Sequence, residues 1–140
     1  MNIFSEVEKL NFPLGEYIVV GSGIMGAYGL KELKDVDIVA TPNLFEKLRK
    51  SGEWQEVQWT YLDHTEGIFL RRNNVEVYLD VNCGDENPTT EKLIDSAKVI
   101  NNIPFINFKQ CLRFKKAYSK NKPKHFKDIE IIEKFLENNK

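Results

Sequence analysis

The sequence predicts an α/β (α+β) fold in which a mixed β-sheet is flanked by helices and followed by a C-terminal helical segment. Two observations lead to this prediction. Strand-like and helix-like patterns alternate early in the chain, and a β-hairpin pattern centred on Asn73-Asn74 follows them. The composition, 41% hydrophobic and 29% charged, is ordinary for a globular protein. Because the chain shows no internal repeat or domain boundary, we expect one domain spanning residues 1–140.

The first half of the chain predicts helices and strands from local patterns. Ile3–Leu10 has the i, i+3, i+4 apolar spacing of a short amphipathic helix, and Tyr17–Val20 is continuously apolar, as in a buried strand. Thr41-Pro42 marks a helix start, with Thr41 as N-cap and Pro42 in the first turn. The remaining expected elements are a helix of small residues over 22–30, a strand over Asp35–Ala40, a helix from Pro42 that stops at Gly52, and an aromatic, β-branched strand over Trp54–Leu62.

The second half predicts a hairpin, an extended segment and further helices. Asn73-Asn74 separates two strand-like runs and tolerates positive φ, which is typical of a two-residue hairpin turn. The expected elements are strands over Ile68–Arg72 and Val75–Val81, a helix from Asn87-Pro88 to about Ala97, an extended stretch over Val99–Phe108 around Pro104, and helices over Phe108–Tyr118 and Phe126–Leu136.

Charge, hydropathy and cysteine content exclude several classes of protein. The net charge of −1 provides no general attraction for nucleic acid or a membrane surface. No apolar run approaches the roughly 18 residues of a membrane span, and the N-terminal residues lack the pattern of a signal peptide. Cys83 and Cys111 are far apart and are expected to be reduced, buried thiols. These features predict a cytoplasmic protein without membrane contacts.

A glycine-rich turn follows the strand Tyr17–Val20. The segment 21–26 reads GSGIMG and matches the G-x-G-x-x-G pattern of dinucleotide sites. In such sites an acid lies about 20 residues further on, at the far end of the next strand. Asp35 and Asp37 come sooner and at the near end, and the intervening helix is short for a parallel crossover. The sequence therefore favours a phosphate-binding turn at Gly21-Ser22 over an NAD site.

Asp35 and Asp37 are the candidate metal ligands. Side chains alternate along a strand, so these two carboxylates are expected on one face. They repel each other unless a cation joins them, and Mg²⁺ (or Mn²⁺) takes one or two carboxylates and completes its shell with water and substrate phosphates. A solvated acidic turn before a strand is the alternative interpretation.

A third carboxylate is expected from a neighbouring strand, as two-metal chemistry usually requires. Along Val75–Val81, Glu76 and Asp80 share one face, but four residues of strand separate them by about 13 Å, so both cannot bind the same metal pair. We favour Glu76, because Asp80 leads into a turn-rich segment where an aspartate has ordinary turn roles. Asp80 remains the alternative, and an exposed acid at the sheet margin is the non-functional interpretation of Glu76.

The order of these motifs resembles the polymerase-β-like nucleotidyltransferase superfamily: Gly-Ser, a short helix, Asp-x-Asp, then an acid on a later strand. Residues 101–136 are similar to the C-terminal part of small prokaryotic members, including the abortive-infection toxin group. In that resemblance Lys115 matches a lysine at the end of a helix, and Lys127 and Asp128 match a second motif. The similarity spans about residues 15 to 137 and implies a nucleotidyltransferase-like fold.

The resemblance implies an enzyme that binds a nucleoside triphosphate such as ATP with Mg²⁺. The enzyme would transfer the nucleoside monophosphate to an acceptor hydroxyl on a protein, an RNA or a small molecule. The implied nucleotide-binding residues are Gly21, Ser22 and Lys115, and the implied catalytic and metal-binding residues are Asp35, Asp37 and Glu76, with Asp80 as the alternative metal ligand. A catalytically silent binding or regulatory module, paired with a small partner protein in a toxin–antitoxin pair, is the competing hypothesis.

The tryptophans, one histidine and a basic loop receive structural interpretations. Trp54 and Trp59 are expected to pack in the core or on a sheet face, although either ring can stack on a nucleobase. His64 is expected in an exposed turn. Lys120, Lys122, Lys124 and Lys127 are expected in a solvated loop, with contact to a polyanion as the alternative.

Overall fold

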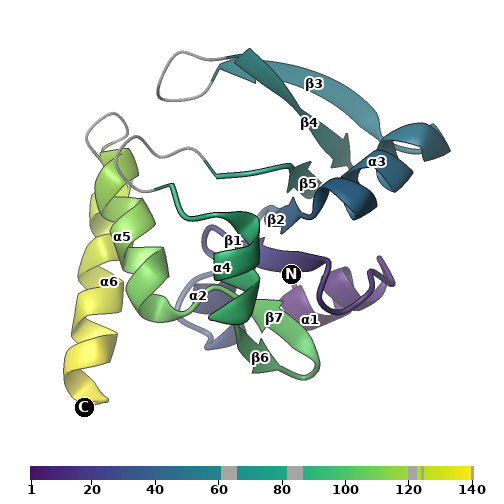
Figure 1. Ribbon diagram of the computed structural model, residues 1–140. Coiled ribbons are helices and arrows are strands. Elements are labelled where there is room, and N and C mark those ends of the chain that lie inside the picture. Colours follow the sequence, from purple (N-terminus) through teal and green to yellow (C-terminus); the bar gives the residue numbers. More distant parts are fainter. Residues whose placement is uncertain (61–65, 82–86, 120–122, 124, 140) are drawn as a thin grey trace.

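The computed structural model describes residues 1–60, 66–81, 87–119, 123 and 125–139. Helices and strands alternate from the N-terminal helix to the third strand, and hairpins and a final pair of helices follow (Figure 1). The helices are α1 (Ile3–Glu8), α2 (Gly23–Ala27), α3 (Pro42–Ser51), α4 (Thr90–Asp95), α5 (Phe108–Ser119) and α6 (His125–Asn138). The strands are β1 (Tyr17–Val20), β2 (Val36–Ala40), β3 (Gln55–Thr60), β4 (Glu66–Arg72), β5 (Val75–Tyr78), β6 (Lys98–Ile100) and β7 (Ile103–Phe105).

The described strands form one mixed sheet in the order β3-β4-β5-β2-β1-β7-β6. β1 runs antiparallel to β2, while β2 is parallel to β5 and β1 is parallel to β7. The other neighbouring pairs are antiparallel. This arrangement confirms the predicted α+β class with a mixed sheet and a helical C-terminal segment.

The centre of the sheet forms the hydrophobic core. Ile18, Val19 and Ile38 on β1 and β2 have 0% of their surface exposed, as expected for strands covered on both faces. Helix α2 lies so close to β1 that a side chain at Gly23 would collide with Val19. The small residues of α2 therefore bring the start of this helix against the strand that leads into it.

Helices α5 and α6 lie side by side at one end of the molecule, on the left of Figure 1. Each helix buries an apolar face, which includes Phe114 of α5 and Ile132 of α6. Just after β7, the Ile106 N–H donates to the Val19 carbonyl at 3.0 Å. The chain therefore enters α5 beside the end of β1, so α5 and α6 pack near the turn that follows β1.

Several predicted boundaries are confirmed. β1 has the predicted limits, and α3 begins after Thr41, whose side chain accepts from the Leu44 N–H at 3.4 Å. The same helix ends at Gly52 in the left-handed conformation with φ of 74°. β4 and β5 form the predicted hairpin, and Asn73 has a φ of 56° in its turn.

Other elements differ from the prediction. α2 stops at Ala27, because the chain reverses before Val36 to enter β2 antiparallel to β1. α4 begins two residues later than expected, since the Thr89 side chain caps it by accepting from the Lys92 N–H. The stretch around Pro104 is a β6–β7 hairpin rather than one extended segment. Its turn contains Asn101 and Asn102, which have φ of 51° and 63°.

Some sequence-based interpretations lie outside the described residues. These concern Cys83, His64 and the lysines at positions 120, 122 and 124. Within the described part, Cys111 is a buried free thiol, Trp54 is buried and Lys127 is exposed on α6. No helix in the described ranges has the length and apolar character needed to cross a membrane.

Candidate active site

The strand register places Asp37 beside the glycine turn. Asp37 on β2 is paired with Val20 on β1 and with Glu76 on β5. Gly21 directly follows Val20 and has a φ of 62°, which a side chain disfavours. A Cβ atom at Gly21 would also lie 2.8 Å from Asp37 Oδ2. Glycine is therefore required for the turn itself and for the close approach of the carboxylate.

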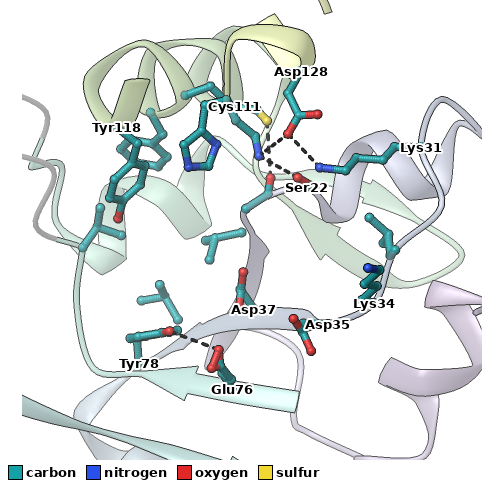
Figure 2. Close-up of a pocket in the computed structure, with 18 of the residues that line it drawn as sticks. Ser22, Lys31, Lys34, Asp35, Asp37, Glu76, Tyr78, Cys111, Tyr118 and Asp128 are labelled. Carbon is teal, nitrogen blue, oxygen red and sulfur yellow. Dashed lines mark hydrogen bonds and ion pairs between the residues drawn. The ribbon is translucent and has the colours of Figure 1, made fainter. Parts of the chain in front are cut away.

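The predicted acids line one pocket of about 580 Å³. Asp35 lies immediately before β2 and is exposed, whereas Asp37 within β2 is half-buried. Figure 2 shows Asp35, Asp37 and Glu76 on the sheet side of this pocket. Asp80, which follows the end of β5, also lines it. The register places Glu76, not Asp80, directly across from Asp37.

Glu76 is engaged by its neighbours within the sheet. Arg71 of β4 donates to Glu76 Oε2 at 3.3 Å, and the Tyr78 hydroxyl donates to Glu76 Oε1 at 3.4 Å. Burial raises the pKa of Tyr78, and the nearby charges of Asp37 and Glu76 raise it further. Tyr78 therefore remains protonated and continues to donate to the carboxylate at neutral pH.

The carboxylate oxygens on this side fit the chemistry of Mg²⁺ or Mn²⁺, which prefer such ligands and accept one or two of them from the protein. Asp37 Oδ2 faces the Gly21 turn. Among the described residues, however, no group of three or more His, Cys, Asp or Glu side chains forms a preassembled metal cluster. Glu76, the candidate third ligand, accepts one hydrogen bond at each of its oxygens, which leaves further lone pairs on both.

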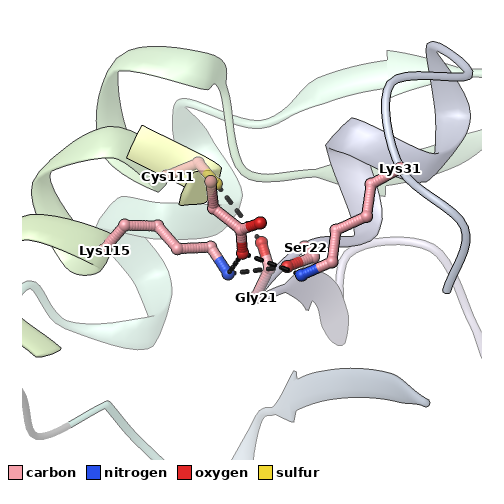
Figure 3. Close-up of polar contacts among 6 residues, drawn as sticks. Gly21, Ser22, Lys31, Cys111 and Lys115 are labelled. Carbon is pink, nitrogen blue, oxygen red and sulfur yellow. Dashed lines mark hydrogen bonds and ion pairs between the residues drawn. The ribbon is translucent and has the colours of Figure 1, made fainter. Parts of the chain in front are cut away.

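Lysines lie on the opposite side of the pocket. Lys115 of α5 donates to Ser22 Oγ at 2.6 Å and to Asp128 Oδ2 at 2.9 Å. Lys31, which follows α2, donates to the same Asp128 oxygen at 2.8 Å. Figure 3 shows Lys31 and Lys115 reaching the Gly21-Ser22 turn from two directions. Two positive charges and one negative charge therefore meet at the glycine turn.

Lys31, Lys115 and Asp128 form the helix-side cluster. Two of its members are buried, and the contacts of Asp128 determine its ionisation. Lys115 and Asp128 are 5% and 4% exposed. Burial alone raises the pKa of Asp128, but hydrogen bonds from Lys31 and Lys115 outweigh it and hold the pKa below its usual value. Beside them, Cys111 donates from Sγ to the Gly21 carbonyl at 3.3 Å, and burial raises the pKa of its thiol to about 11. The cysteine is therefore a neutral donor that fixes the turn.

The structure brings every sequence-predicted site residue to this one pocket. These residues are Gly21, Ser22, Asp35, Asp37, Glu76, Asp80 and Lys115. Sequence reasoning missed Lys31, which has no distinguishing pattern in the sequence. It favoured packing over base stacking for Trp59, and this half-buried ring packs on Phe69 and Tyr78 and also lines the pocket.

The topology rules out the dinucleotide alternative for the glycine turn. A Rossmann site requires the strands on either side of the glycine-rich helix to be parallel members of a βαβ unit. Here β1 and β2 are adjacent and antiparallel. Four pairs of residues face each other along them, beginning with Tyr17 opposite Ala40 and ending with Val20 opposite Asp37. The short helix predicted to be unsuitable for a crossover is indeed part of an antiparallel connection.

The mixed sheet, the glycine turn after β1 and the flanking helices define a nucleotidyltransferase-like fold. The chain is similar to the crystal structure of ANT(2")-Ia in complex with adenylyl-2"-tobramycin, with a TM-score of 0.52 and 13% sequence identity. The match covers 96% of this chain and 86% of that chain. At this identity the similarity extends to the fold alone. No family model and no curated protein sequence matches the chain.

Proposed function

We propose that the protein is a nucleotidyltransferase that transfers a nucleoside monophosphate from a nucleoside triphosphate to an acceptor hydroxyl. The observation that carries this proposal is the division of charge across one pocket. Asp35, Asp37 and Glu76 occupy the sheet side, Lys31 and Lys115 around the single carboxylate of Asp128 occupy the helix side, and the Gly21-Ser22 turn lies between them. A triphosphate with a divalent cation presents the complementary charges, because its metal binds carboxylates and its phosphate oxygens bind lysines and backbone N–H groups.

On the sheet side, Asp35 and Asp37 would hold the cation, and Glu76 or Asp80 would complete its shell. A divalent cation bound there would neutralise phosphate charge and lower the pKa of an acceptor hydroxyl bound to it. Asp37 has the central role, since it lies beside both the glycine turn and Glu76. Its position beside the turn would bring a phosphate bound at Gly21-Ser22 close to a cation held by the aspartates.

On the helix side, Ser22 and Lys115 would bind the triphosphate. The Lys115 ammonium is already oriented toward Ser22 Oγ, at 2.6 Å, so little side-chain freedom is lost when a phosphate arrives. Positive charge aimed at developing phosphate charge contributes directly to the rate of such transfers. Lys115 would therefore stabilise the leaving pyrophosphate.

Calorimetry with each of the four nucleoside triphosphates in Mg²⁺ tests the donor, and pyrophosphate release in the presence of candidate acceptors tests transfer. ATP is the first donor to try, and a hydroxylated small molecule the first acceptor, since the structural neighbour holds an adenylylated small molecule. Binding should disappear with a chelator and in Asp37→Asn. Asp95→Asn is the matched control, because Asp95 is exposed on α4 and does not line the pocket. No heat with any triphosphate would contradict the proposal.

A second candidate function is binding without catalysis, as in a silent module of a toxin–antitoxin pair like those of the abortive-infection group. Two observations favour this alternative: Glu76 is bonded to Arg71 and Tyr78, and the described residues contain no preassembled group of three or more metal-ligating side chains. It predicts triphosphate binding with no pyrophosphate release for any protein, RNA or small-molecule acceptor. Release with any acceptor rejects it.

A further inference from the structure

Lys31 and Lys115 share one acceptor atom but differ in how firmly they are held. Both donate to Asp128 Oδ2, at 2.8 Å and 2.9 Å. The Lys115 side chain is 7% exposed and is also bonded to Ser22, whereas the Lys31 side chain is 37% exposed. One ammonium is therefore enclosed and anchored at two points, and the other reaches the same carboxylate from the open side of the pocket.

This difference determines which lysine can change partner. Two ammonium groups at one oxygen repel each other, and a single carboxylate neutralises only one of them. A partly exposed ion pair contributes little to stability, so Lys31 can exchange Asp128 for another anion with little loss of free energy. Breaking a buried pair is strongly destabilising, which holds Lys115 in place.

Lys31 is also located where a polyphosphate would extend. It lies in the connection between α2 and β2, four positions before Asp35, and lines the same pocket as Gly21 and Asp37. In Figure 2 its side chain points from the right toward Ser22 and Asp128. A phosphate chain that begins at the metal site and follows the glycine turn therefore approaches the Lys31 ammonium.

We propose that Lys31 is a movable cation that leaves Asp128 for the terminal phosphates of a bound triphosphate, and so selects triphosphates over monophosphates. Lys115 stays at Ser22 and Asp128 and contacts the phosphates nearer the reacting centre. Before a triphosphate binds, Asp128 is the hydrogen-bond partner of Lys31. This inference rests on the proposed function, since it assigns the polyphosphate part of the same site.

Calorimetry with ATP, AMP and inorganic tripolyphosphate, each with Mg²⁺, tests this role in the full chain. Lys31→Ala should weaken ATP and tripolyphosphate binding by about 10-fold or more, as expected for a lost charge-assisted hydrogen bond. AMP affinity should not change, and Lys31→Arg should restore most of the ATP affinity. Lys47→Ala is the matched control, because Lys47 is exposed on α3 and does not line the pocket. Thermal unfolding of each variant checks that the fold is intact.

The outcomes separate this inference from the proposed function. Equal weakening of ATP and AMP in Lys31→Ala, or no weakening of ATP, overturns the role of Lys31 while nucleotidyl transfer stands. Tripolyphosphate binding that depends on Lys31 in a protein without transfer activity supports the inference and rejects the proposed function. If the wild-type chain binds neither ATP nor tripolyphosphate, both are wrong.

Discussion

The two sides of the pocket are held in different ways. On the sheet side, the backbone hydrogen bonds that join β2 to β5 position Asp37 and Glu76. On the helix side, side-chain bonds to Asp128 position Lys115 and Lys31. The backbone ladder persists when a carboxylate is replaced by an amide of the same shape. The helix-side cluster does not persist in this way, because each charged group there is held by another.

The two sides therefore differ in how far a substitution that changes function also changes the stability of the fold. Substitutions on the sheet side should change chemistry with little effect on folding. Substitutions on the helix side should change folding as well, since a buried charge that loses its partner is strongly destabilising. Variants of each side can therefore show whether this division is real.

The largest effect is expected for Asp37→Asn. Loss of a carboxylate that holds the cation should lower the transfer rate by about 1,000-fold, because metal stabilisation of the transition state is worth several kcal/mol. Asn keeps the shape of Asp, so the midpoint of thermal unfolding should stay near that of the wild type. A large loss of stability would mean that the sheet side is not held by its backbone alone.

The next effect is a loss of stability in Lys115→Met. Removing one partner of the buried pair leaves Asp128 with only the partly exposed Lys31, which should lower the free energy of unfolding by about 3 kcal/mol. Lys116→Met is the matched control, because this neighbouring lysine pairs at the surface with Glu133. Urea denaturation should show a change within about 0.5 kcal/mol for the control. Equal losses in the two variants reject the buried cluster as a stabiliser.

The same cluster predicts a dependence on pH. Because the pKa of Asp128 is lowered in the folded state, its carboxylate stabilises the fold at every pH above its unfolded value of about 4. That contribution is lost as the pH falls through the lower folded pKa. The stability difference between wild type and Asp128→Asn should therefore be constant near neutral pH and shrink under acid, as measured by denaturation at several pH values. A difference that grows toward acid contradicts the assignment.

A smaller effect is expected for Gly21→Ala, which tests the contact between the glycine turn and Asp37. The left-handed φ alone should lower stability by about 1–2 kcal/mol. Gly52→Ala is the matched control, since Gly52 also has a positive φ but a Cβ there meets nothing within 4 Å. Both variants should lose similar stability, while only Gly21→Ala should weaken triphosphate binding through displacement of Asp37. Equal binding by the two variants removes the functional role of the close approach.

The smallest effect distinguishes the two candidates for the third carboxylate. Glu76→Gln should weaken metal-dependent triphosphate binding by about 10-fold, whereas Asp80→Asn should have little effect, because Glu76 is the residue paired with Asp37. Calorimetry on the two variants decides between them. If only Asp80→Asn weakens binding, the register is a poor guide to the third ligand and Asp80 has that role.

Local sequence patterns predicted the sheet side, whereas on the helix side only the family resemblance indicated Lys115 and Asp128, and nothing indicated Lys31. Tyr17–Val20 and the spacing of Asp35 and Asp37 carry local signals, since apolar runs and alternation determine a strand and its faces. Lys31 meets Asp128 across 97 positions of sequence, and no local pattern encodes such a contact. The β6–β7 hairpin was missed because Pro104 lacks an N–H, which argues against a strand. Asn101-Asn102 is nevertheless the same turn signal that located the β4–β5 hairpin.

The long sequence separation of the helix-side contacts also has a consequence for folding order. Ser22 and Lys115 are 93 positions apart, and contacts that close such long loops form late. At a synthesis rate of about 5–20 residues per second, the turn at Gly21 and the strand with Asp37 leave the ribosome on the order of ten seconds before α6 does. During that interval the acids can assemble in the presence of Lys31, which precedes them in the chain, but without Lys115 and Asp128. The nascent pocket therefore lacks its buried ion pair at first, and Lys31 acquires its Asp128 partner only when α5 and α6 dock.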